Sequence, residues 1–206
     1  FAAGGDACVI STINGDSNVP FYKEFANQGL TADDCPIMAF SVAEDELRGM
    51  DTSALVGHLA AWNYYQSIDT PENKKFVQNF KNYCKKNNLP GGTSRVTDDP
   101  IEAAYYGVYV WKKSVEKAGS TDVNAVRKAA YGMEFSAPGG PKKIDEMNQH
   151  TYKPVLIGKI RADGQFDTIN KSPGLVRPLP WSEYTSPDKD CDHVNHDGTY
   201  TKTAKK

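Results

Sequence analysis

Several features that would assign this chain to a familiar class are missing from its 206 residues. No apolar run approaches the ~18–20 residues that a membrane-spanning helix needs. Lysine and arginine total 24 against 26 aspartate and glutamate residues, so the net charge of -2 provides no basic field for nucleic acid. The four cysteines form no CxxC pair, which excludes a zinc ribbon and a thioredoxin motif.

Motifs of enzyme chemistry are missing as well. The sequence contains no GxSxG and no HExxH, and no serine–histidine pair with supporting context. We therefore expect no enzymatic activity, no cofactor and no metal. Residues that favour metals gather only near the C-terminus, at Cys191, His193 and His196, where a solvated polar tail is the simpler interpretation.

What remains is typical of a globular protein, with 39% hydrophobic and 24% charged residues. The length allows one large domain or two small ones and needs neither a metal nor a disulfide to fold. Cys8 opens the first predicted strand, and Cys35 directly precedes the second. A disulfide between them is sterically possible if the strands are parallel neighbours. Two buried free thiols are the alternative that we favour.

The residues from Cys8 to Phe25 form the most informative local pattern. Val9–Ile13 predicts a buried strand, a polar loop follows, and Pro20 opens a helix that ends at Gly29. A strand followed at once by a helix is typical of an α/β sheet. Such sheets bind ligands outside the carboxyl ends of their strands, so we expect an α/β fold with a ligand site at this loop.

The rest of the chain alternates between strands and helices. A second strand is predicted at Pro36–Phe40, and long helices begin at Thr70–Pro71 and Asp98–Pro100. The second of these carries Tyr105 and Tyr106, which we expect in the core. Beyond Met133 the pattern predicts strands and turns, including a β-hairpin with Asp-Gly at its turn and strands Val155–Ile160 and Phe166–Ile169.

The loop after the first strand supplies the first candidate ligand contacts. It carries amide, carboxylate and hydroxyl groups, but neither a nucleophile–base pair nor a phosphate cradle. Such groups suit a small neutral polar molecule, since they hydrogen-bond N–H and C=O groups. Helix capping by the aspartate and the serine is the alternative. The residues are Asn14, Gly15, Asp16 and Ser17.

A second loop follows the second strand at the same edge of the predicted sheet. Phe40, Ser41 and Glu44 are its candidate contacts, with Glu44 accepting ligand N–H groups. A carboxylate that stabilises the start of a helix is an equally good interpretation of Glu44. Trp62 either lines the pocket or packs at a hinge, and packing is the interpretation that we favour.

The order of short motifs along the chain resembles the carboxyl-terminal half of the type I periplasmic binding proteins. It is most similar to the branch that binds urea and short-chain amides. The resemblance extends from Phe1 to about Trp181 and is specific because many motifs occur in the family's order. They include STINGDSNVPFYKEFANQGL, AFSVAEDELRG, GHLAAWNYYQSIDTPENKKFV, RVTDDPIEAAYYGVYVWKKSVEKAG and NQHTYKPVLIGKIRADGQF.

The resemblance implies part of a two-lobed fold, with a parallel sheet, flanking helices and a carboxyl-terminal β-hairpin. Residues 1–58 would belong to the carboxyl-terminal lobe. Residues 59–135 would form a crossover and the helical part of the amino-terminal lobe. Residues 136–181 would contain the return crossover, the hairpin and a closing extended segment, and residues 182–206 a polar tail.

The resemblance also implies a periplasmic or otherwise extracytoplasmic protein that binds urea or a short amide between its lobes. Its partners would be the membrane subunits of an ABC transporter. A complete member carries a comparable stretch upstream of Phe1, so we expect a fragment that lacks the amino-terminal half of the fold. The alternative is a truncated half-domain that serves as a structural or interaction module without a ligand.

Overall fold

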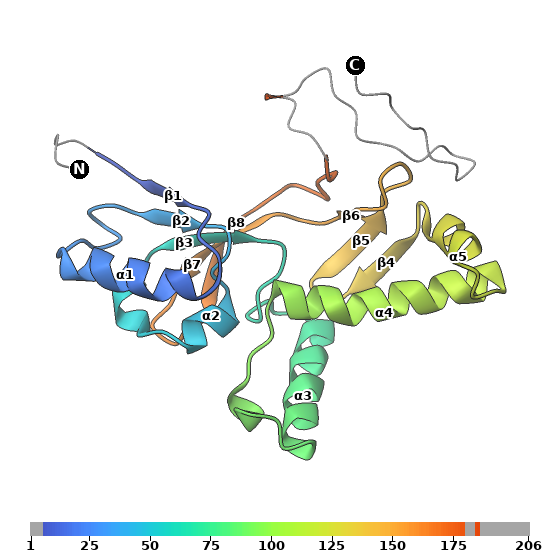
Figure 1. Ribbon diagram of the computed structural model, residues 1–206, viewed down its shortest axis with the longest axis horizontal. Coiled ribbons are helices and arrows are strands. Elements are labelled where there is room, and N and C mark those ends of the chain that lie inside the picture. Colours follow the sequence, from blue (N-terminus) through green and yellow to red (C-terminus); the bar gives the residue numbers. More distant parts are fainter. Residues whose placement is uncertain (1–5, 180–183, 186–206) are drawn as a thin grey trace. The chain divides into compact units, whose positions relative to one another are not determined.

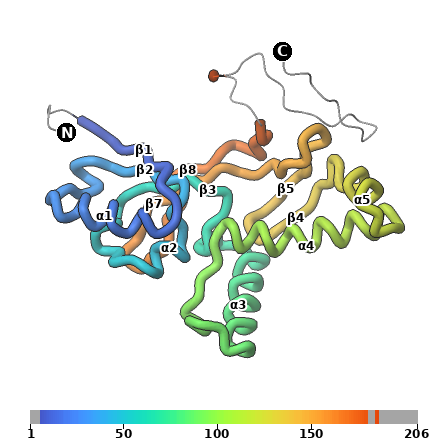
Figure 2. Tube along the Cα trace, in the orientation of Figure 1, coloured from blue at the N-terminus to red at the C-terminus, as the bar shows by residue number. Residues whose placement is uncertain are grey.

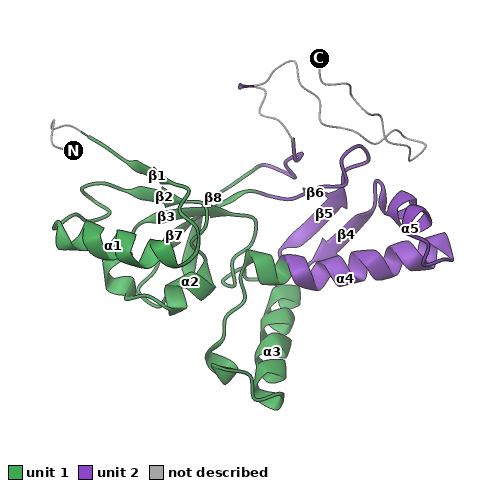
Figure 3. Ribbon diagram, in the orientation of Figure 1, with its two compact units in different colours: residues 1–102, 155–172 green, residues 103–154, 173–206 purple. Residues whose placement is uncertain are grey.

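The computed structural model describes residues 6–179 and 184–185 (Figures 1 and 2). The chain divides into two compact units (Figure 3), residues 1–102 with 155–172 and residues 103–154 with 173–206. Each unit therefore combines segments that are distant in the sequence. Cys191, His193 and His196 of the predicted tail lie outside the described residues.

A five-stranded mixed sheet forms the first unit, in the order β1-β2-β3-β7-β8. Its first three strands are parallel, and the hairpin joins β3 antiparallel, with Ala60 opposite Gly158. The predicted α/β fold with an added hairpin is confirmed. The strands are β1 (Val9–Ser11), β2 (Ile37–Ala39), β3 (Leu59–Trp62), β7 (Leu156–Ile160) and β8 (Phe166–Lys171).

The first strand is shorter and less buried than its sequence suggested. It lies at the edge of the sheet and pairs only with β2, so Ile10 is 63% exposed. The prediction of two buried thiols is wrong for Cys8, which is exposed, whereas Cys35 is buried. Both are free cysteines in the described part of the chain, so the possible disulfide is not formed.

Helices cover the core of the first unit and connect its strands. Helix α1 (Asn18–Asn27) buries Tyr22 and Phe25, and Gly29 ends it with a positive φ of 74°. Helix α2 (Glu44–Arg48) follows β2, and helix α3 (Pro71–Lys86) begins with its Thr70 cap, as predicted. No helix within the described residues is long and apolar enough to cross a membrane.

The second unit combines two helices with a small antiparallel sheet in the order β4-β5-β6. Helix α4 (Asp99–Ala118) enters it from the first unit and α5 (Val123–Ala130) follows. The loop around Pro138–Gly139 is the turn of a hairpin, with Ala137 opposite Gly140. Its strands are β4 (Glu134–Ala137), β5 (Gly140–Ile144) and β6 (Thr151–Tyr152).

One glycine in the first unit is required by close packing. The rings of Tyr65 and Phe166 stack with centroids 4.6 Å apart beside Gly158. A Cβ at Gly158 would lie 2.6 Å from Tyr65 Cζ and 2.9 Å from Phe166 Cδ1. The Tyr65 hydroxyl donates to the Ala60 carbonyl at 2.7 Å, so the ring is anchored and cannot easily move away.

Replacing Gly158 with alanine is therefore expected to lower the free energy of unfolding by about 1–3 kcal/mol, as overpacked cores do. Chemical denaturation of the purified protein measures this change. Gly174→Ala is the control, because its added Cβ meets no atom within 4 Å. Equal effects of the two substitutions would contradict the packing argument.

An ion pair holds the closing extended segment, which contains Val176 and Arg177, against the rest of the second unit. Arg177 Nε donates to Oδ2 of the buried Asp145 at 2.8 Å, and the Val176 N–H donates to the Lys153 carbonyl at 2.8 Å. Burial by itself raises the Asp145 pKa. Hydrogen bonds from Arg177 and from the backbone N–H groups of Met147 and Asn148 outweigh burial and lower the pKa to about 2.

We expect Arg177→Ala to release this segment at neutral pH, seen as faster hydrogen exchange of the Val176 amide. A lowered carboxyl pKa contributes stability above the unfolded value near 3.9, which is lost as the pH falls toward 2. The difference in Val176 hydrogen-exchange rate between the variant and the wild type should therefore become smaller as the pH falls toward 2. Arg161→Ala, which removes only surface ion pairs with Asp163 and Asp167, should leave the Val176 amide unchanged.

Candidate functional site

Parallel pairing brings the two predicted loops to one edge of the first unit's sheet. Val9 lies opposite Ile37 and Ser11 opposite Ala39, so β1 and β2 end at the same level. The Phe40 N–H donates to the Ser11 carbonyl at 3.2 Å, which extends this alignment past the strands. The carboxyl ends of parallel strands are where α/β sheets bind ligands.

The first loop folds into a one-turn helix, Gly15–Ser17, between β1 and α1. Gly15 has a φ of 63°, a conformation that favours glycine. Asn14, Gly15, Asp16 and Ser17 are all exposed. Ser17 stands before α1, yet its side chain makes no capping hydrogen bond within the described structure. Capping therefore does not account for the polar groups of this loop.

The second loop presents side chains of very different exposure. Phe40 is 43% exposed, Ser41 is half-buried, and Glu44 is only 1% exposed at the start of α2. One oxygen of Glu44, Oε1, accepts a hydrogen bond from the Gln66 N–H at 2.6 Å. The other, Oε2, is buried without a hydrogen-bond partner among the described residues. A buried acceptor without a donor is costly, which makes Glu44 a candidate for more than helix stabilisation.

Burial raises the pKa of the Glu44 carboxyl to about 8, against the lowering effect of its hydrogen bond from Gln66. Asp98 contributes to this rise through like-charge repulsion, and its own pKa is raised to about 6, mainly by burial. Near neutral pH the Glu44 carboxyl therefore favours the neutral form, whereas Asp98 is mostly ionised but holds its proton to a higher pH than an ordinary aspartate.

Trp62 has a clear packing role. Its indole Nε1–H donates to the Val42 carbonyl at 2.8 Å, which ties the end of β3 to the second loop. The side chain is half-buried and packs against the core cluster. The packing that we favoured is thus present, while a contact between Trp62 and a ligand stays a prediction.

The sequence reasoning missed Gln66, which connects four segments of the first unit. Its N–H donates to Glu44, and its carbonyl accepts from Asn73 Nδ2 at 2.9 Å. Its side-chain oxygen accepts from the Thr97 N–H at 2.8 Å, and its side-chain nitrogen donates to Gln165 Oε1 at 3.0 Å. A glutamine after two tyrosines gives no sequence signal for this role, because its partners lie up to 99 residues away.

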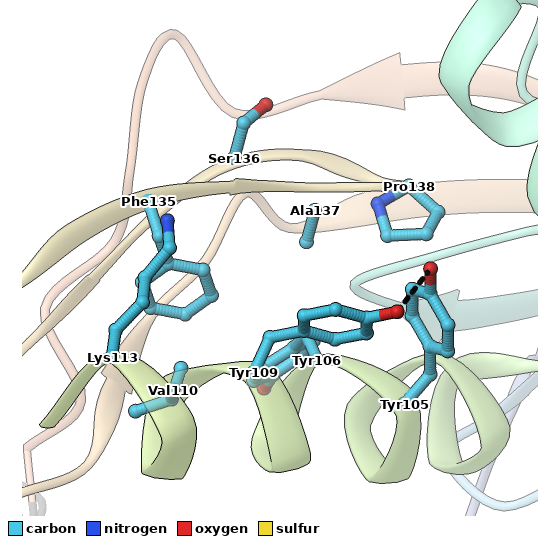
Figure 4. A pocket seen from close by; sticks show the side chains of 9 residues that line it. All are labelled: Tyr105, Tyr106, Tyr109, Val110, Lys113, Phe135, Ser136, Ala137 and Pro138. Carbon is cyan, nitrogen blue, oxygen red and sulfur yellow. Dashed lines mark hydrogen bonds between the residues drawn. The ribbon is translucent and has the colours of Figure 1, made fainter. Parts of the chain in front are cut away.

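The second unit has its own cavity of about 200 Å³ between α4 and β4 (Figure 4). Tyr105 and Tyr109 line it from the helix, with their hydroxyls 3.4 Å apart, and Phe135 and Pro138 line it from the strand side. The expectation of a core position is wrong for Tyr105, which is 41% exposed, and holds for Tyr106, which is 8% exposed. The lining is mainly apolar and differs in character from the edge of the first unit's sheet.

Comparison with protein families matches residues 2–187 to the model described as "Periplasmic binding protein domain". The chain belongs to this family. The resemblance to type I periplasmic binding proteins is thereby confirmed at the level of the family. Similarity to the urea- and amide-binding branch is not part of this match and stays a prediction, as do the lobe boundaries.

Curated relatives and solved structures agree with this family. A Leu/Ile/Val-binding protein homolog from Brucella melitensis is 27% identical over 150 residues, 71% of this chain and 36% of that protein. A solute-binding protein of an ABC transporter from Rhodopseudomonas palustris, solved with 4-hydroxybenzoate, is 25% identical with a TM-score of 0.67. It matches 83% of this chain and 46% of that structure.

A second structure from Rhodopseudomonas palustris, solved with 3,4-dihydroxybenzoic acid, has a TM-score of 0.71 at 22% identity. It covers 86% of this chain and 47% of that one and shows the shared fold. The family member described here thus spans about a third of the curated binding-protein relative and just under half of the solved structures.

One relative carries an enzyme's name. A protein called limonene hydroxylase from Geobacillus stearothermophilus is 30% identical over 132 residues, 63% of this chain and 23% of that protein. Since the match covers under a quarter of it, the name does not say which part carries the activity. The family and the solved structures point instead to solute-binding proteins.

The raised pKa of Glu44 has a testable consequence for stability. In the folded protein the Glu44 carboxyl keeps a proton that it loses near pH 4.5 in the unfolded chain. The free energy of unfolding therefore falls as the pH rises from about 4.5 to 8. Glu44→Gln keeps the shape and removes the titration. We expect the variant to flatten this fall, which is on the order of a few kcal/mol.

Chemical denaturation at several pH values between 4.5 and 8.5 measures this effect. Asp98 should supply the slope that remains, because its pKa is also raised. Glu24→Gln, at an exposed position of α1, is the matched control and should keep the wild-type slope. A variant curve parallel to wild type would show that Glu44 ionises normally in the folded protein.

Proposed function

We propose that this chain is part of an extracytoplasmic solute-binding protein that binds urea or a short-chain amide and delivers it to an ABC transporter. The observation that carries the proposal is the buried, unsatisfied Oε2 of Glu44 at the carboxyl edge of the sheet. Family membership supports a binding role, since the matched family and structures are solute-binding proteins.

The chemistry of the edge favours a ligand rich in N–H groups. Urea offers four N–H donors and one carbonyl acceptor, and the first loop and Glu44 present carboxylate and amide oxygens. In this proposal Asp16 and Glu44 accept from the ligand, while Ser17 and Ser41 serve its carbonyl. Asn14, Gly15, Phe40 and Trp62 shape the surrounding wall.

The ligands of the two similar structures, 4-hydroxybenzoate and 3,4-dihydroxybenzoic acid, carry a carboxyl group. A carboxylate placed beside Asp16 would meet a like charge. A hydrogen-bonding site rejects a ligand that leaves its buried polar groups unpaired. This favours an amide over those acids for the described edge.

The proposal includes two kinds of protein partner. One is the set of transporter membrane subunits, which would recognise the ligand-closed form of a two-lobed protein. The other is the remaining half of the fold, since the chain spans under half of the solved structures. Helix α4 offers a surface for that half, with Val108 65% and Trp111 57% exposed.

The same exposed helix supports a second candidate function. A half-domain that binds another protein through Val108 and Trp111 would need no small ligand. Exposed apolar patches of this kind mark protein interaction sites. The two candidates make opposite predictions for small amides, so one titration separates them.

The test is thermal unfolding of the purified protein with urea or acetamide at low millimolar concentration, beside leucine and 4-hydroxybenzoate. A ligand that binds only the folded state should raise the midpoint saturably, by roughly 5–10 °C at 100 times its Kd. Urea and acetamide should do so and the two acids should not. Denaturation by urea needs molar amounts and does not interfere.

Asp16→Ala should abolish the rise, and Asp33→Ala should retain it, because Asp33 is an exposed carboxylate outside the loops of the site. A flat response of the wild type to urea and acetamide would overturn the amide proposal and favour the interaction module. A rise with 4-hydroxybenzoate or leucine alone would replace the amide by a carboxylic acid.

A further inference from the structure

The cavity between α4 and β4 lies apart from the proposed amide site. All the residues that line it fall within residues 103–154, so it belongs to the second unit alone (Figure 4). Its volume is about 200 Å³. An apolar cavity of about 150 Å³ is enough to hold one benzene molecule. The space therefore fits a single six-membered ring with a small substituent.

Aromatic side chains from both the helix and the strand line the cavity. The ring centroids of Tyr106 and Phe135 are 5.3 Å apart, and those of Tyr105 and Tyr109 are 5.0 Å apart. Aromatic rings attract one another at centroid separations of about 4.5–7 Å, beyond what the burial of their area contributes. The lining therefore favours a flat aromatic ring over an aliphatic ring of the same size.

Two tyrosine hydroxyls meet at one end of the cavity, near Pro138 (Figure 4). The Tyr105 hydroxyl donates to the Tyr109 hydroxyl at 3.4 Å, longer than the usual distance of about 2.7–2.8 Å for such a bond. Tyr109 uses one lone pair in this bond, so its proton and its second lone pair can serve a ligand. A ligand hydroxyl, which both donates and accepts, matches this end of the cavity.

The charges near the cavity favour a neutral ligand. The Nζ atoms of Lys142 and Lys153 lie 5.4 and 5.7 Å from the centroid of the Tyr106 ring, and they would repel a cation. Lys113 lines the cavity but is itself exposed, and an exposed ion pair stabilises little. A carboxylate would therefore lose its hydration in the apolar lining without an equal return.

We propose that this cavity binds a neutral monocyclic aromatic molecule of the phenol class. Its ring would pack against Tyr106 and Phe135, and its hydroxyl would exchange hydrogen bonds with Tyr109. Successive residues advance by about 100° around a helix, which places Val108 and Trp111 on the side of α4 opposite the cavity. The proposed surface for the other half of the fold therefore leaves this site open, and the inference does not rest on the proposed amide site.

The experiment titrates the full chain with phenol at millimolar concentration. NMR follows the backbone amides of Val110 and Phe135, which line the cavity from the helix and from the strand. Phenol should shift both amides saturably. Cyclohexanol has a similar size and a hydroxyl but no aromatic ring, and it should bind severalfold more weakly. 4-Hydroxybenzoate adds a carboxylate to phenol and should bind at least tenfold more weakly.

Two leucine variants of β4 test whether phenol occupies the cavity. The Ala137 side chain points toward α4, whereas the Ser136 hydroxyl points away from the helix (Figure 4). Ala137→Leu should fill the cavity and abolish the phenol-induced shifts. Ser136→Leu places the same side chain on the other face of the strand and should retain them.

A tyrosine variant keeps the test decisive if Ala137→Leu fails to fold, because Tyr109 is 49% exposed. Tyr109→Phe removes only the hydroxyl, so it should weaken the binding of phenol severalfold and leave the binding of toluene unchanged. Tyr83→Phe is the matched control, at a tyrosine of α3 that is 61% exposed in the first unit. It should change the binding of neither ligand.

Saturable shifts with phenol that are lost in Ala137→Leu or weakened in Tyr109→Phe, and retained in both controls, support the inference. The absence of shifts with phenol, or shifts that neither variant changes, would overturn it. Binding of cyclohexanol or 4-hydroxybenzoate as tight as that of phenol would overturn it as well. Since phenol is not a ligand in the amide titration, the inference and the proposed function can each fail without the other.

Discussion

The parallel alignment of β1 and β2 is the constraint on which the site depends. It ends both strands at one level, so the loops that follow them meet at the same edge. Two hydrogen bonds connect later segments to the second loop. The Trp62 indole donates to the Val42 carbonyl, and the Gln66 N–H donates to the Glu44 carboxyl. Without this alignment the acceptors of the two loops would point to separate regions of solvent.

The consequence is an edge with more acceptors than donors. Glu44 and Asn18 each keep one buried oxygen without a donor among the described residues. Folded proteins rarely leave such atoms unpaired, and exceptions call for a functional explanation. The polar character of this edge distinguishes it from the aromatic cavity of the second unit.

Local sequence patterns were sufficient for most elements of the fold. The Thr70 cap, Gly29 after α1 and the Asp-Gly turn of the hairpin act through neighbours a few residues away, and all three appear as predicted. Exposure was harder to predict. Ile10 and Tyr105 looked like core residues, but an edge strand and an uncovered helix face expose them.

The sequence by itself determined the fold class, the family and the two loops, because strand, turn and cap signals are local and many motifs occur in order. Only the tertiary structure decided which side chains are buried and which acceptors lack donors. The role of Gln66 depends on Thr97 and Gln165, which are 31 and 99 residues away in the sequence. Whether a donor reaches the buried oxygen of Asn18 is likewise decided by the tertiary structure, and no local pattern encodes it.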